Sequence, residues 1–126
     1  MEGAPSLNGK IPSMEGCVFC RIARGEERAR VVYESEKVIA FHTIRPEAKV
    51  HILVIPKEHY ERIDEIEDEQ TAYELFKAIR EVARMFNMDS FRVVNKNGAS
   101  VGQTVMHVHI HVLSGDLPHR LFPGSE

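Results

Sequence analysis

Three histidines at alternate positions constrain the fold and the chemistry of this chain more than any other feature. His107, His109 and His111 are separated by single apolar residues in the run 107–113. In a β-strand, successive side chains point to opposite faces, so this spacing predicts a strand with three imidazoles on one face and a buried apolar face behind them. Because stacking three titratable rings brings no evident packing benefit, the run indicates chemistry rather than structure alone.

Apolar periodicity and turn residues predict the other elements of the fold. The expected order is β-β-β-α-β-β, which is typical of an α+β domain with an antiparallel sheet of about five strands and one long helix. The apolar stripe of that helix should pack on the sheet. The predicted elements are a helical turn at Phe19–Ala23, strands at Val31–Glu34, Lys37–Ile44, His51–Ile55, Phe91–Asn95 and Val105–Leu113, and a helix at Asp68–Asn87.

Length and charge limit the classes of protein that fit. The chain has 126 residues, which suits one compact domain, expected at residues 14–126 after a flexible tail or added extension at residues 1–13. A net charge of −3 provides no overall field for nucleic acid or an anionic membrane, so neither partner is expected. The apolar runs are short and no signal-peptide core precedes the domain, so we expect a soluble, cytoplasmic protein.

The loop before the last strand contains two glycines that tolerate positive φ. Asn97-Gly98 is first of all a hairpin signal, and Gly102 follows it directly before Gln103 and Thr104. This loop would place backbone N–H groups and two polar side chains beside the imidazoles. Such donors suit a phosphoryl oxygen.

The only two cysteines, Cys17 and Cys20, form a second chemical feature. They could be a redox pair or incidental buried thiols, but the strand-helix-strand context of thioredoxin-like motifs is missing. Two thiolates and two imidazoles would form a closed tetrahedral zinc site. Candidates for the imidazole ligands are His51, His59 and His107.

These motifs together resemble the histidine triad (HIT) family of nucleotide-binding hydrolases and transferases. The resemblance rests on Gly-Gln-Thr-Val at 102–105 before the histidine run, on residues 51–59 (His-Ile-Leu-Val-Ile-Pro-Lys-Glu-His) and on residues 41–46 (Phe-His-Thr-Ile-Arg-Pro), and it covers Cys17 to Pro123. It implies that the middle histidine, His109, attacks the α-phosphorus of a nucleotide. The nucleotidyl-imidazole formed would then be hydrolysed by water.

The same resemblance implies roles for further residues. His111 would hold the phosphoryl oxygens or the leaving group, and one structural Zn²⁺ per chain would bind Cys17, Cys20, His59 and His107, with His51 as the substitute for His59. Thr43 stands where relatives commonly carry an aspartate for the ribose hydroxyls, and its neutral hydroxyl is a weaker acceptor than a carboxylate. The implied substrate-binding residues are Phe19, Phe41, His42, Thr43, Ile44, Asn95, Gly102, Gln103 and Thr104, of which Phe19, Phe41, His42 and Ile44 would frame the adenosine.

Three functional readings follow. The leading one is a hydrolase of nucleoside 5′-phosphoramidates or related nucleoside phosphoesters and anhydrides, closest to the phosphoramidase branch and acting on a purine nucleotide. A dinucleoside polyphosphate hydrolase with the same nucleophile is the alternative. A third possibility, of a different class, is a zinc-stabilised nucleotide-binding or interaction module, or a metal site made of the three histidines. The three-histidine site is awkward, because residues two apart on a strand lie about 6.6 Å apart along it and all three rings would have to converge on one ion. The resemblance also implies a homodimer, to which Leu75, Phe76 and residues 91–94 could contribute.

Overall fold

The computed structural model describes residues 16–115 and confirms the predicted α+β class. The predicted tail at residues 1–13 lies outside these residues. Among the described residues, no helix is long and apolar enough to cross a bilayer. The elements are α2 (Val18–Ala23), β1 (Val31–Glu34), β2 (Val38–His42), β3 (Val50–Pro56), α3 (Glu69–Met85), β4 (Arg92–Asn95) and β5 (Ile110–Ser114), with short 3₁₀ helices at Ile63–Glu65 and Ala99–Val101.

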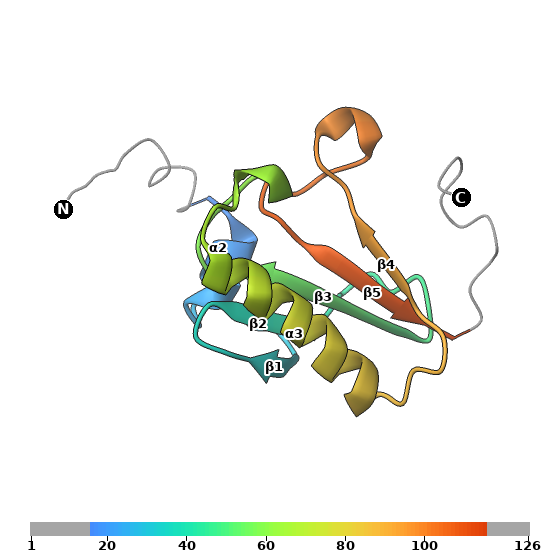
Figure 1. Ribbon diagram of the computed structural model, residues 1–126. Helices are drawn as coiled ribbons and strands as arrows, with labels where there is room; N and C mark the ends of the chain where they lie inside the picture. The colour runs from blue at the N-terminus through green and yellow to red at the C-terminus, as the bar shows by residue number, and fades with distance from the viewer. Residues whose placement is uncertain (1–15, 116–126) are drawn as a thin grey trace.

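The strands form one five-stranded sheet in the order β1-β2-β3-β5-β4, with every neighbouring pair antiparallel. β3 is central, and α3 lies across one face of the sheet (Figure 1). The register of β3 and β5 sets Leu53 opposite His111 and His51 opposite Leu113. Because paired residues share a face, this register brings His51 and His111 to the same side of the sheet.

Both faces of the sheet are covered. On one face, the apolar residues of β2, β3 and β5 pack against Leu75, Ala78 and Val82 of α3. On the other face, Phe19 and Ile22 of α2 join the alternate residues of β2 and β3 in a second cluster. The predicted helical turn, α2, therefore partly covers the histidine face of the sheet.

Glu74 fastens α3 to the turn between β1 and β2. Its carboxylate is only 5% exposed and accepts hydrogen bonds from Ser35 Oγ at 2.6 Å, from the Lys37 amide at 2.8 Å and from Gln70 Nε2 at 2.7 Å. These three donors satisfy the buried carboxylate and, with the nearby charge of Lys37, lower the pKa of Glu74. This contact fixes α3 to the turn between β1 and β2.

The predicted last strand is too long. It was expected from Val105, but β5 begins at Ile110, so only His111 of the three histidines lies in a strand. The chain bends at residues 105–107, where the His107 amide donates to the Val105 carbonyl, and the Val108 amide then bonds Tyr60 rather than a strand partner. The two-residue alternation of side chains continues through the bend even though the strand pairing does not.

Other element boundaries shift by a few residues. β2 ends at His42 instead of Ile44, and β4 begins at Arg92 instead of Phe91. α3 starts after Asp68, whose carboxylate caps the Thr71 amide at 3.1 Å, and it ends at Met85 instead of Asn87. Asn87 has a φ of 52°, which a continuing helix does not allow.

Candidate active site and metal centre

His109 is held in one tautomer by its own chain. Its ring is 8% exposed, and Nδ1 lies 2.8 Å from the carbonyl oxygen of His107. A carbonyl only accepts, so Nδ1 carries the proton and Nε2 keeps its lone pair. Burial lowers the pKa of His109, and the hydrogen bond to the His107 carbonyl offsets only part of this effect. The ring is therefore a neutral imidazole at neutral pH, which is the form a nucleophile needs.

His111 is oriented by His51 through a second chain of hydrogen bonds. The Glu47 amide donates to His51 Nδ1 at 3.1 Å, so His51 Nε2 carries the proton and donates to His111 Nδ1 at 2.9 Å. His111 then carries its own proton on Nε2. Burial, together with the nearby His109, His51 and Lys96, lowers the pKa of His111 to about 3. His111 thus presents a neutral N–H donor beside His109, with ring centroids 5.1 Å apart.

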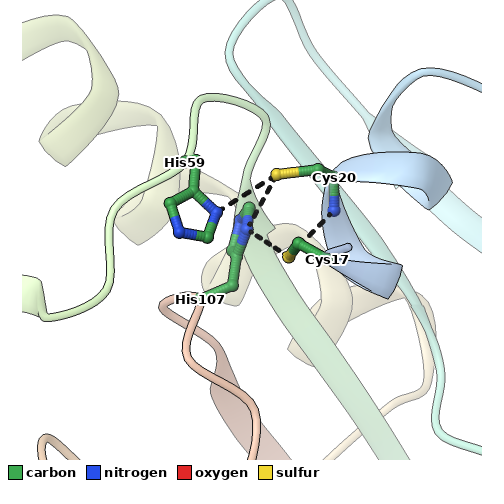
Figure 2. Close-up of side chains that lie close together, drawn as sticks. All are labelled: Cys17, Cys20, His59 and His107. Atoms are coloured by element: carbon green, nitrogen blue, oxygen red, sulfur yellow. Dashed lines mark hydrogen bonds between the residues drawn. The ribbon is translucent and has the colours of Figure 1, made fainter. Parts of the chain in front are cut away.

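Four other side chains converge on a separate point, shown in Figure 2. Cys17 Sγ lies 3.3 Å from His107 Nδ1. Cys20 Sγ lies 3.2 Å from His59 Nδ1 and 3.5 Å from His107 Nδ1. All four ligand atoms are within 4.8 Å of one another. The predicted set Cys17, Cys20, His59 and His107 is therefore assembled and could hold a metal ion, whereas the substitute His51 lies with His111.

The donor set fits zinc. A tetrahedral Zn²⁺ with bonds of about 2.0–2.3 Å separates its ligand atoms by about 3.3–3.8 Å, close to the distances between the Sγ and Nδ1 atoms here. His107 Nε2 donates to the Pro56 carbonyl at 2.8 Å, which leaves the Nδ1 lone pair facing the sulfurs. His59 Nδ1 is turned to Cys20, and its buried Nε2 has no hydrogen-bond partner among the described residues.

Without a metal ion, Cys17 ionises far more readily than Cys20. Burial alone would raise the pKa of Cys17, but hydrogen bonds from His107 and His59 outweigh it and lower the pKa to about 5. Burial and the Cys17 thiolate raise the pKa of Cys20 to about 12. A bound dication would remove this repulsion and let both sulfurs ionise.

His107 connects the cluster of Cys17, Cys20 and His59 to His109. Its ring faces the two cysteines while its carbonyl holds His109 Nδ1. Phe19, which lies between the cysteines in α2, packs edge-on against both rings, with centroids 5.9 Å from His107 and 5.2 Å from His109. The cysteine-bearing turn therefore helps to fix the position of the catalytic candidate.

The glycine loop is braced by the polar side chains that the sequence assigned to substrate. Gln103 is 3% exposed; its Oε1 accepts from the Gly98 amide, and its Nε2 donates to the Glu61 and Val105 carbonyls. Asn95 Nδ2 donates to the His109 carbonyl at 3.1 Å. These two side chains hold the loop and the histidine run together, and their contact with a substrate stays a prediction. Thr104 is exposed.

The loop glycines have the predicted backbone conformations. Gly98 has a φ of 111° and Gly102 a φ of 102°. Only glycine adopts such angles without strain. Gly102 is also exposed, so its backbone lies open beside the histidine run.

The residues expected to frame an adenosine do not lie on one face of the sheet. Phe41 packs on Phe19 with ring centroids 5.7 Å apart, on the histidine face. The ring of His42 lies instead against Phe86, at the end of α3 on the opposite face. Ile44 is 92% exposed beyond the end of β2. Side chains alternate along the strand, so Phe41 and His42 diverge.

The Thr43 side chain makes a local hydrogen bond, while its backbone amide donates to the His51 carbonyl at 3.2 Å. Its Oγ1 accepts from the Arg45 amide at 3.2 Å. This bond leaves the hydroxyl proton for another acceptor. A role in ribose binding stays a prediction.

Lys96 is the residue near the histidines that sequence reasoning passed over. It was treated as part of the loop, yet its charge acts on both His109 and His111. The missing signal was the register of β4 against β5, which pairs Val94 with His111. Without that pairing, a lysine in a polar loop looks like a solvated surface residue.

Comparisons with known proteins identify the family and the fold. The HIT domain profile matches residues 24–117. An uncharacterised HIT-like protein of Methanocaldococcus jannaschii is 45% identical over 100 residues, covering 77% of each chain. A histidine triad protein from Clostridium difficile has a TM-score of 0.76 at 40% identity, covering 82% of this chain and 94% of that one. A HIT family hydrolase from Legionella pneumophila has a TM-score of 0.77 at 32% identity, and the match covers 84% of this chain and 99% of that one. The chain therefore belongs to the HIT domain family.

Proposed function

We propose that this protein hydrolyses nucleoside 5′-phosphoramidates, or related nucleoside phosphoesters and anhydrides, through a covalent nucleotidyl-His109 intermediate. The observation that carries the proposal is the tautomer of His109: the proton is tied to the His107 carbonyl, and the lone pair of Nε2 remains for attack. The solved relative described as a HIT family hydrolase supports the reaction class.

The chemistry needs two displacements at phosphorus. In the first, the His109 Nε2 lone pair forms a bond to the α-phosphorus, and the bond to the leaving group breaks with its electron pair on that group. A phosphate leaves as an anion, whereas an amine takes up a proton from solvent water as it leaves. The His111 Nε2–H hydrogen-bonds the leaving atom or a non-bridging oxygen. In the second, water attacks phosphorus, the P–N bond breaks with its electrons returning to Nε2, and the nucleoside monophosphate and a proton are released.

Zinc has a structural place in this proposal. Cys17, Cys20, His59 and His107 would hold Zn²⁺ in a closed tetrahedral site, so the ion would supply cross-linking rather than an open coordination position. It would fasten α2 to the segment that carries His109. A zinc-stabilised nucleotide-binding module remains the outcome if binding occurs without turnover.

We also propose a homodimer through β4 and the outer side of α3. β4 is an edge strand of the sheet. Apolar side chains are exposed there, with Phe76 76%, Val93 47% and Phe91 44% accessible. Unpaired strand edges and exposed aromatic side chains are features of association surfaces. Sedimentation velocity should give twice the mass of one chain, and a monomer at micromolar concentration would reject the dimer.

The functional proposal is tested with adenosine 5′-phosphoramidate. His109→Ala should lower kcat/KM by at least about a thousandfold, as expected for loss of a covalent nucleophile. Zinc content and melting temperature serve as controls, because the substituted ring is not among the cluster ligands. Retained hydrolysis in a folded, zinc-loaded variant would refute the nucleophile assignment.

A further inference from the structure

Lys96 directly follows β4 on the side of the sheet that carries the histidines. β4 and β5 pair so that Val94 lies opposite His111 and Asn95 opposite Ile110. The Asn95 side chain bonds the His109 carbonyl, so the two segments stay side by side beyond the last paired residues. One more step of the same alternation would set Lys96 beside His109, on the face that Val94 and His111 share, and the Lys96 charge does act on both of these histidines.

The Lys96 side chain also lies across the glycine loop. A Cβ at Gly102 would stand 3.3 Å from Lys96 Cδ and 3.4 Å from Nζ. The ammonium group is therefore placed over the bare backbone of Gly102. The same charge contributes to the lowered pKa of His111, which agrees with this position. A cation thus lies against the glycine loop and close enough to the two neutral imidazoles for its charge to act on them.

From this placement we propose that Lys96 contacts the leaving group and selects nucleotides whose leaving group is an anionic phosphate or polyphosphate over those that release an amine. The inference rests on the proposed attack of His109 at the α-phosphorus and deepens it by naming the leaving-group class. It favours the anhydride members of the proposed substrates. Residue 96 then sets the specificity of this chain.

The chemistry of the two leaving groups explains the selection. When a phosphate leaves, the electron pair of the breaking P–O bond remains on an oxygen that is stable as an anion near neutral pH. An ammonium group at that position neutralises the charge and donates a hydrogen bond, and no proton has to be transferred. An amine must gain a proton as its P–N bond breaks. A neighbouring cation opposes that protonation, so the same lysine hinders amine release.

The kinetic test compares two substrates in the zinc-loaded protein. They are diadenosine tetraphosphate, with an anionic leaving group, and adenosine 5′-phosphoramidate. Lys96→Met keeps most of the aliphatic stem over Gly102 but removes the charge. We expect kcat/KM for diadenosine tetraphosphate, divided by kcat/KM for adenosine 5′-phosphoramidate, to fall about tenfold, as for loss of one charge-assisted hydrogen bond. Lys96→Arg should keep most of the ratio. Lys77→Met, an exposed lysine on α3, is the matched control.

A binding test separates failure of this inference from failure of the proposed function. Wild-type protein should bind α,β-methylene-ADP more tightly than AMP, and Lys96→Met should reduce that advantage about tenfold by calorimetry, whether or not turnover occurs. An unchanged substrate ratio and an unchanged binding advantage would overturn the role of Lys96. An equal loss of kcat/KM for both substrates and of affinity for both ligands would also overturn it, because that result would indicate that Lys96 only holds the glycine loop in place. Absence of turnover and of a His109 adduct, with the binding advantage intact, would instead reject the proposed function alone.

Discussion

Replacing His111 by Asn should reduce the loss in the free energy of unfolding that occurs as pH falls below neutral. In the folded protein the pKa of His111 is lowered to about 3, first by burial and then by His109, His51 and Lys96. In the unfolded chain an ordinary histidine titrates near pKa 6.5. Between these two values the unfolded state binds more protons than the folded state. Stability therefore rises with pH in this window, is lost as pH falls toward 3, and does not change from this group above about pH 6.5.

The size of the effect follows from the two pKa values. At about pH 4.5 the unfolded ring is almost fully protonated and the folded ring almost fully neutral, so linkage gives a loss of about 2–3 kcal/mol relative to pH 7. Because the His111 ring is only half-buried, solvent screening reduces this figure, and we expect about 1–2 kcal/mol. His111→Asn removes the titration while its Oδ1 can still accept from His51 Nε2.

The assay is urea unfolding of both zinc-loaded proteins at a series of pH values from about 7 to 4.5. Protonation of the metal ligands lowers the free energy of unfolding of both proteins alike, so the difference between the curves isolates residue 111. The free energy of wild-type protein should fall by about 1–2 kcal/mol more than that of the variant. Parallel curves would show that His111 is not a buried neutral ring and would refute the assigned hydrogen-bond chain from His51.

Two further variants test the metal cluster and the fold separately. Cys17→Ser should lower bound zinc well below one ion per chain and lower the melting temperature, because one of four ligands is replaced by a poor one; equal zinc stoichiometry by atomic emission would contradict the cluster. Glu74→Ala leaves Ser35 and Lys37 without their acceptor and should lower the free energy of unfolding by about 2–3 kcal/mol, measured in urea. Since Glu74 holds α3 on the face opposite the histidines, kcat/KM should not change in the folded variant, and a matching loss of activity would contradict that separation.

The class of the fold was predictable because it depends on periodicity. Alternating apolar residues and one amphipathic helix leave few arrangements other than an antiparallel sheet with a helix on one face. The start of β5 was not predictable in the same way. The histidine run keeps its alternation up to Ile110, but its backbone bonds the Tyr60 carbonyl, a contact made by a distant segment that periodicity does not record.

The site was predictable in residue type and less so in arrangement. Spacing alone left both His51 and His59 open as zinc ligands, and the family resemblance favoured His59. The register of β3 against β5 places His51 with His111, and His59 lies beside Cys20. Gln103 looks like a substrate ligand because it is polar and follows a glycine. In the fold its side chain braces the loop through Gly98, Glu61 and Val105, a use that sequence alone does not reveal. Contact of Gln103 with a substrate stays a prediction.

The most direct test of the central claim is to trap the intermediate. The zinc-loaded protein would be mixed with an adenosine phosphoramidate labelled at the α-phosphorus, quenched within milliseconds, and examined by intact mass and peptide mapping. The geometry predicts one adenylyl group per active chain, carried by Nε2 of His109 and absent from His109→Ala. Turnover without any labelled histidine, or an adduct on His111 instead, would contradict the account.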